Sequence, residues 1–165
     1  MEARKGKSAT IEPNHFLVSL CQSVDLDLVA MLKQDAPQRD LLLEELLREV
    51  RRLRTVFRAA GLDAREFRHE LRSSIAGNRM IESESARLRR SAASKETFTG
   101  AERYAEVGNS VVYPIHLLIA LLATADRSRD GLMRQHGGDP EVLRKASKNE
   151  IIPTSGSRRR IAGKN

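Results

Sequence analysis

Apolar residues are concentrated in two stretches of the chain that begin with nearly the same sequence pattern. Residues 112–122 read VYPIHLLIALL and residues 11–21 read IEPNHFLVSLC, so each stretch presents a β-branched residue, a proline and a histidine in the same order. Proline is tolerated in the first turn of a helix, where its missing N–H would have no partner, and the leucine-rich run behind it favours a helix. Because each run is apolar on almost every side, the pattern predicts two helices buried at the centre of one core.

A glycine and an aspartate mark a second pair of matching positions. Gly61 and Asp63 follow an apolar pair, and so do Gly137 and Asp139. This spacing predicts a helix that ends at a glycine in the left-handed conformation, followed by an aspartate that caps the next helix. The repeat motif therefore consists of Pro13, His15, Leu17, Gly61, Asp63, Pro114, His116, Leu118, Gly137 and Asp139.

The expected fold is all-α, with two similar multi-helix repeats related by pseudo-twofold symmetry and one inserted helix in the first repeat. The double-repeat domain should span residues 1–151, with the first repeat at 9–77 and the second at 99–151. The proline and histidine stretch and the glycine that follows it are farther apart in the first repeat than in the second, which indicates the insertion.

Two segments are expected to connect or follow the repeats. Residues 78–98 are rich in Ser, Arg and Glu, which predicts a linker. A short helix at 99–107 should open the second repeat, with Tyr104 and Val107 facing inwards. Residues 152–165 include Pro, Ser, Gly and three consecutive arginines, which is typical of a flexible basic tail or linker.

The inserted helix, expected at about 37–56, carries a seam of apolar residues spaced three or four places apart. Two explanations of this seam stay open. It packs on the repeat core, or it protrudes as an arm that binds a partner or a second copy. The seam consists of Leu43, Leu46, Val50, Leu53 and Phe57.

The order of these motifs resembles the Clp N-terminal domain, a helical double-repeat module at the front of Clp-type AAA+ protein unfoldases. In that family a Pro-x-His-Leu-Leu run is followed in each repeat by a glycine, an aspartate and a later Leu-Arg pair. Residues 11–17 and 114–122 match the first part. The second part is matched by residues 61–63 with 67–68 and by residues 137–139 with 143–144. The chain differs from the family in its shorter leading segment and in the insertion.

The resemblance implies a non-catalytic domain that docks substrates or adaptors for an ATP-dependent unfoldase. Its partners would be protein clients or an adaptor protein, and a Clp-type AAA+ ATPase ring in the same chain or on another. An apolar groove would capture an exposed hydrophobic segment, either where the two repeats meet or along the seam. Two alternatives belong to other classes: a self-associating helical scaffold and a basic helical protein that binds nucleic acid.

Composition bears on these alternatives. Lys and Arg number 29 against 22 Asp and Glu, for a net charge of +7, which permits an acidic partner. Aromatic residues make up only 4% of the chain and no nucleic-acid motif is present, which argues against nucleic acid. A basic surface could be formed by Arg51, Arg52, Arg54, Arg58, Arg65, Arg68, Arg72, Arg87, Arg89 and Arg90.

Candidate chemistry is sparse. The string nearest to a phosphate-binding loop, residues 162–165, lacks the first glycine and the hydroxyl residue, so no ATP hydrolysis, cofactor or enzyme activity is expected. The histidines have no metal-ligand spacing, and His15 and His116 are expected to make structural hydrogen bonds near helix termini. Cys21 should be a packed thiol. With no apolar stretch long enough for a membrane span and no signal peptide, a cytoplasmic protein is expected.

Overall fold

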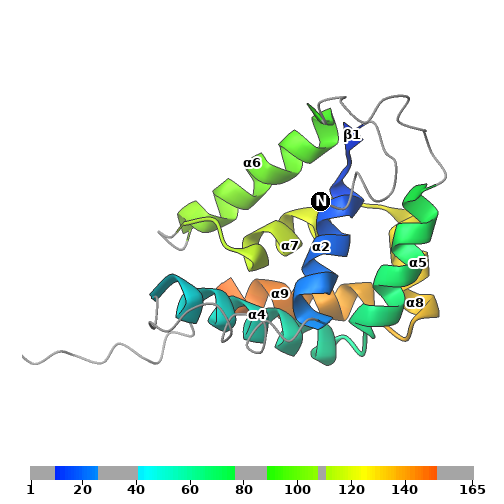
Figure 1. Ribbon diagram of the computed structural model, residues 1–165, viewed down its shortest axis with the longest axis horizontal. Coiled ribbons are helices and arrows are strands. Elements are labelled where there is room, and N and C mark those ends of the chain that lie inside the picture. Colours follow the sequence, from blue (N-terminus) through cyan, green and yellow to red (C-terminus); the bar gives the residue numbers. More distant parts are fainter. Residues whose placement is uncertain (1–9, 26–40, 77–88, 108–110, 152–165) are drawn as a thin grey trace, which may run out of the picture.

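Helices make up nearly all of the structure, as the sequence predicts. The computed structural model describes residues 10–25, 41–76, 89–107 and 111–151, and these ranges form seven helices and one pair of very short strands (Figure 1). In chain order the elements are β1 (Thr10–Ile11), α2 (Pro13–Asp25), α4 (Leu41–Ala59), α5 (Ala64–Ala76), β2 (Arg89–Arg90), α6 (Ala92–Val107), α7 (Pro114–Ala123), α8 (Arg127–Gln135) and α9 (Pro140–Ile151).

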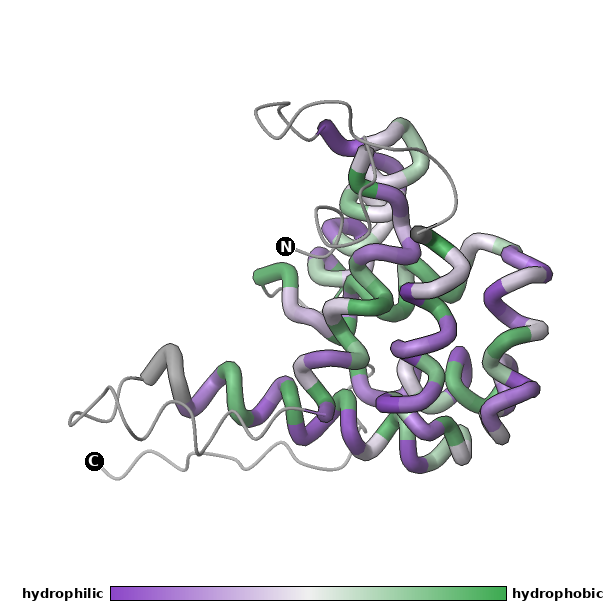
Figure 2. The backbone as a smooth tube through the Cα atoms, turned by 45° about the vertical axis from the view of Figure 1, so that its right-hand side comes forward, coloured by the Kyte–Doolittle hydropathy of each residue, from purple (hydrophilic) through white to green (hydrophobic). Residues whose placement is uncertain are grey.

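Helices α2 and α7 form the centre of the core. Helix α2 packs against α4, α5, α6 and α7, and α7 also packs against α4, α6 and α9. Leu17 in α2 and Leu118 and Leu121 in α7 have no exposed surface. Figure 2 shows hydrophobic residues gathered in the middle of the molecule, with polar residues along the outer helices. The apolar runs are therefore buried because other helices surround them on several sides.

The start of the chain is tied to α6 by a short parallel strand pair. Thr10 pairs with Arg89 and Ile11 with Arg90. The carbonyl of Ile11 then accepts hydrogen bonds from the backbone N–H of Ser91, at 3.1 Å, and from the hydroxyl of Ser94. These contacts bring β1 and the first turn of α6 together across about half of the sequence (Figure 1).

The linker predicted at 78–98 ends earlier than expected. Helix α6 begins at Ala92, because the hydroxyl of Ser91 accepts a hydrogen bond of 3.1 Å from the backbone N–H of Ser94. The inward-facing role predicted for Val107 is wrong, since its side chain is 80% exposed, whereas Tyr104 packs against the core. Residues 78–88 and the tail at 152–165 lie outside the described residues.

Helix α4 covers residues 41–56 of the predicted inserted helix and extends beyond them. It runs without a break to Ala59, and residues 37–40 lie outside the described part. Val50, Leu53 and Phe57 are buried, so these seam residues pack in the core. Leu46 is 41% exposed, and the side chain of Leu43 is not described. The first turns of α4 project from the helices around them (Figure 2).

Two glycine turns lie against each other between the halves of the chain. Gly61 has φ of 70° and Gly137 has φ of 76°, so both adopt the left-handed conformation that favours glycine. The backbone N–H of Asp139 donates to the carbonyl of Ala60 at 3.0 Å, which joins the two turns directly.

Among the described residues, no helix is both long and apolar enough to cross a membrane.

Candidate functional site

The two histidines of the repeat motif cap the helices that they open. The Nδ1 atom of His15 accepts the backbone N–H of Glu12 at 2.9 Å, and Nδ1 of His116 accepts that of Tyr113 at 3.0 Å. Each histidine lies three residues after the residue whose N–H it binds. In a capping box this position is occupied by Glu or Gln, so the histidine takes the place of that residue. This is the structural hydrogen bond predicted from the sequence, and it engages Nδ1 in each ring.

Charged residues surround His116 where α4, α7 and α9 meet. Glu49 is buried, and its Oε1 atom accepts a hydrogen bond of 2.7 Å from Arg52. Arg52 also binds Glu150, at 3.4 Å to the carboxylate and 2.8 Å to the carbonyl. Burial lowers the pKa of His116 below its ordinary value of 6.5, against the opposing attraction of Glu49. The imidazole is therefore neutral in the folded protein, as its acceptor role at Nδ1 requires.

We expect His116 to make the protein less stable in acid. Because its pKa is lower in the folded state, the unfolded chain binds the proton first as pH falls below 6.5, and the free energy of unfolding decreases. His116→Asn keeps an acceptor near the Nδ1 position but cannot titrate. Urea unfolding of both proteins across this pH range should show a smaller loss of stability for the variant. Equal losses would contradict the role assigned to His116.

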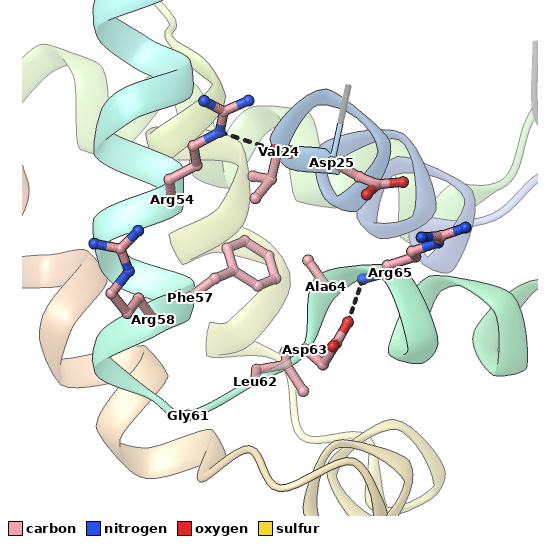
Figure 3. Close-up of a pocket in the computed structure, with 10 residues that line it drawn as sticks. All are labelled: Val24, Asp25, Arg54, Phe57, Arg58, Gly61, Leu62, Asp63, Ala64 and Arg65. Atoms are coloured by element: carbon pink, nitrogen blue, oxygen red, sulfur yellow. Dashed lines mark hydrogen bonds between the residues drawn. The ribbon is translucent and has the colours of Figure 1, made fainter. Parts of the chain in front are cut away.

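A pocket of about 620 Å³ opens between α4, α5 and the end of α2, and we name it the Phe57 pocket (Figure 3). The ring of Phe57 points into the space between these helices, with Arg54 and Arg58 on the α4 side and Arg65 on the opposite side, beyond Ala64. Its volume falls within the range, roughly 300 to 1,000 Å³, that suits a small ligand or a peptide side chain. The lining consists of Val24, Asp25, Arg54, Phe57, Arg58, Gly61, Leu62, Asp63, Ala64 and Arg65.

The acidic residues of the Phe57 pocket already have partners. Asp25 forms an ion pair of 2.9 Å with Arg68. The Oδ1 atom of Asp63 accepts the backbone N–H groups of Arg65 and Glu66 at 2.9 and 3.0 Å, which caps α5 as predicted. Arg54 donates from Nε to the carbonyl of Val24 at 2.9 Å. The charge at the pocket mouth is therefore dominated by arginine.

A second pocket, of about 450 Å³, lies between α6 and α7. Tyr104, Val107 and Ala123 contribute to its wall. The two helices approach closely here, since a Cβ placed on Gly100 would lie 3.3 Å from the Cβ of Ala120. This pocket brings no group of ionisable side chains into contact, so we treat it as a surface hollow.

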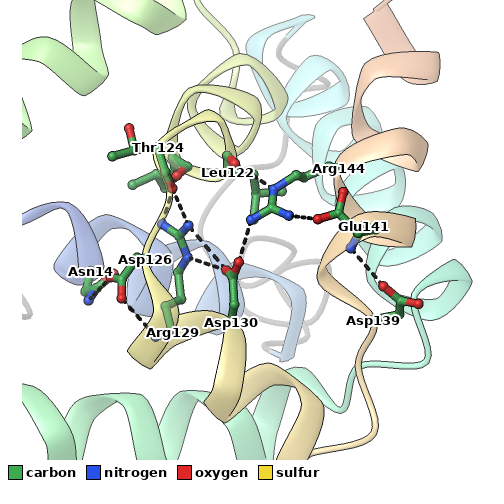
Figure 4. A network of polar contacts seen from close by, with 10 residues as sticks. Asn14, Leu122, Thr124, Asp126, Arg129, Asp130, Asp139, Glu141 and Arg144 are labelled. Carbon is green, nitrogen blue, oxygen red and sulfur yellow. Dashed lines mark hydrogen bonds and ion pairs between the residues drawn. The ribbon is translucent and has the colours of Figure 1, made fainter.

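The most extensive polar cluster in the described structure closes the end of α7 (Figure 4). Arg129 is 3% exposed and donates to the carbonyls of Leu121 and Thr124 at 2.8 and 2.6 Å. Arg144 donates to the carbonyl of Leu122 at 2.8 Å and pairs with Asp130 at 2.6 Å. The last carbonyls of a helix have no partner within the helix, so these arginines serve as its C-terminal cap.

Potential metal ligands do not gather into a site within the described ranges. There, no three residues of the His, Cys, Asp and Glu types lie close enough to hold a metal ion. The thiol of Cys21 is buried, and burial raises its pKa, so it is a packed side chain. Sequence reasoning included Arg54, Arg58 and Arg65 among many arginines but had no signal that placed them around one pocket.

Comparison with known proteins found no relative of this chain: no protein-family model, no curated protein and no solved structure matches it.

Proposed function

We propose that this chain is a non-catalytic docking domain of a Clp-type ATP-dependent unfoldase in the cytoplasm. It would present protein clients or an adaptor to an AAA+ ATPase ring carried on the same chain or on another. The observation that carries the proposal is that the two copies of the sequence motif make the same local contacts. The motif is the basis of the resemblance to the Clp N-terminal domain, so its structural agreement supports that family.

The glycine turns make the same backbone hydrogen bonds. The N–H of Leu62 donates to the carbonyl of Phe57 at 3.1 Å, and the N–H of Gly138 donates to that of Met133 at 2.9 Å. Both are the longer hydrogen bond of a Schellman motif. The aspartate that follows each turn caps the next helix, since Oδ1 of Asp139 accepts the N–H of Glu141 at 2.8 Å. Agreement at this level supports a duplicated unit.

The packing of the helices is consistent with a pseudo-twofold relation between the halves. Helix α2 packs on α5 as α7 packs on α9, and α4 packs on α9 as α8 packs on α5. Helices α2 and α7 contact each other between these pairs. These pairs correspond when the two halves are exchanged, whereas the contacts of α4 with α2 and α7 have no counterpart of similar extent in α8. The corresponding pairs support our proposal that the chain contains two Clp-type repeats.

Client capture would take place in the Phe57 pocket, which opens beside the glycine turn of the first repeat. An apolar client side chain would gain about 25 cal/mol for each Å² that it buries. Much of that gain is offset by the cost of ordering an unfolded segment. We therefore expect weak and reversible binding, with Kd of about 1 to 100 μM.

Two measurements test the docking function. The immobilised chain should capture a Clp-type AAA+ ATPase from an extract of its own organism, identified by mass spectrometry. It should also bind reduced, carboxymethylated α-lactalbumin, which is unfolded, more tightly than the native disulfide-bonded form, as measured by fluorescence anisotropy. Capture of neither the ATPase nor the unfolded protein would refute the proposal.

The alternative classes predict different results in simple assays. Sedimentation at tens of micromolar should give a monomer, whereas a self-associating scaffold would give a dimer or larger species. Burial of Val50, Leu53 and Phe57 removes most of the seam that such a scaffold would use. A shift of DNA or RNA at low salt would instead favour the nucleic-acid alternative.

A further inference from the structure

We propose that the Phe57 pocket selects an extended peptide segment in which glutamate or aspartate side chains flank a large apolar side chain. This inference rests on the proposed docking function and narrows it to one class of client. It follows from an apolar floor, a basic rim and two guanidinium groups that have no partner in the described structure.

The floor of the pocket is apolar and firmly packed. Phe57 and Leu62 are 1% and 6% exposed, and both belong to the hydrophobic core. Val24 packs against the same core at the end of α2. Because these residues are held by their neighbours, the pocket is formed before a ligand arrives, which reduces the ordering cost of binding. A phenylalanine or leucine side chain of the ligand would contact Val24 and Ala64, the partly exposed apolar residues of the lining.

The rim carries arginines from two different helices. Arg54 and Arg58 belong to α4, and Arg65 belongs to the first turn of α5 (Figure 3). In the described part of the chain, the guanidinium groups of Arg58 and Arg65 make no hydrogen bond or ion pair. The two aspartates of the lining are engaged with Arg68 and with the start of α5. A ligand carboxylate would therefore meet arginines that have donors to offer.

The aspartates also determine which anionic polymer fits. Asp25 and Asp63 lie beside the arginines, and they would repel the continuous phosphate backbone of a nucleic acid. Base stacking needs an accessible aromatic face, whereas Phe57 is almost wholly buried. A peptide with separated carboxylates can place its acidic groups on the arginines and avoid the aspartates. The charge pattern thus favours an acidic, hydrophobic peptide.

Fluorescence anisotropy with labelled peptides tests this selectivity on the full chain. The probe is a short, C-terminally amidated peptide with glutamates on both sides of a phenylalanine, and its counterpart has glutamines in place of the glutamates. We expect the acidic peptide to bind about tenfold more tightly, and its binding to weaken as salt is raised. The double variant Arg58→Gln, Arg65→Gln should lose most of this preference.

The matched control is Arg127→Gln, Arg134→Gln, which removes the same charge from exposed positions of α8. It should bind the acidic peptide like the wild type. Equal binding of both peptides, an equal loss in both double variants, or binding only when the peptide has a free carboxyl end would overturn the inference. So would self-association of the wild type that the Arg58, Arg65 variant abolishes, because the occupant would then be a second copy.

The unfolded α-lactalbumin assay separates failure of this inference from failure of the docking function. If unfolded protein still binds and the acidic peptide shows no preference, the charge selectivity is refuted and docking stands. If neither binds and no ATPase is captured, the docking function itself is refuted.

Discussion

Replacement of Arg129 by methionine should lower the free energy of unfolding by about 3 to 5 kcal/mol. The guanidinium group donates to two carbonyls at the end of α7, and its Nε atom lies 3.4 Å from Asp130. Methionine fills much of the same volume but donates nothing, so the buried carbonyl of Leu121 and the partly buried carbonyl of Thr124 lose their partner. Each lost partner leaves a desolvated polar group without compensation.

Urea unfolding monitored by circular dichroism measures this loss. Arg134→Met is the control, because Arg134 lies on the same helix and is exposed, and it should change stability by less than about 0.5 kcal/mol. If Arg129→Met costs less than about 1 kcal/mol, the network in Figure 4 does not close α7 in the way that we describe.

Gly61→Ala should destabilise the protein by about 2 kcal/mol. The positive φ of Gly61 costs an L-residue about 1 to 2 kcal/mol. In addition, a Cβ at this position would lie only 3.0 Å from the carbonyl oxygen of Gly137, so the two glycine turns would have to move apart. That movement would lengthen the hydrogen bond between the backbone N–H of Asp139 and the carbonyl of Ala60.

Gly131→Ala provides a control that should change the stability in the opposite direction. Gly131 lies within α8, and a Cβ there would meet no atom within 4 Å. Alanine favours the helix over glycine by roughly 0.5 to 1 kcal/mol, so this variant should be more stable than the wild type. If Gly61→Ala were as stable as Gly131→Ala, the close contact of the two turns would be refuted.

The sequence could predict those features that depend on local patterns. Runs that are apolar on all sides identified α2 and α7, and the glycine and aspartate pairs located the turns before α5 and α9. The histidine positions indicated helix caps, because a side-chain acceptor three residues into a helix reaches its first N–H groups. The duplicated unit and its family, by contrast, stay predictions.

The early start of α6 was missed because its buried face is made of small or polar residues. Ser94 and Ala101 have no exposed surface and Thr97 is 6% exposed, yet none of them gives the apolar period of an amphipathic helix. Close approach to α7 at Gly100 explains why small residues suffice there. The contact between α6 and α7 thus explains a helix that the local sequence pattern does not indicate.

The candidate site was beyond sequence reasoning for a related reason. Arg58 and Arg65 look like the other exposed arginines of the chain, and only the turn at Gly61 brings them to one pocket. The buried charges of Glu49 and Arg129 were equally hidden, since a helical pattern cannot show whether a charged residue faces a partner across the fold.

The packing of α4 on α9 means that the apolar face of α4 is synthesised before the helix that covers it. During synthesis on the ribosome, the apolar face of α4 emerges roughly 80 residues before that helix, counted from the end of α4 to the start of α9. Until α9 has left the exit tunnel, Leu53 and its neighbours must remain open to other chains. A domain proposed to hold unfolded proteins therefore passes through a stage in which it needs such protection itself.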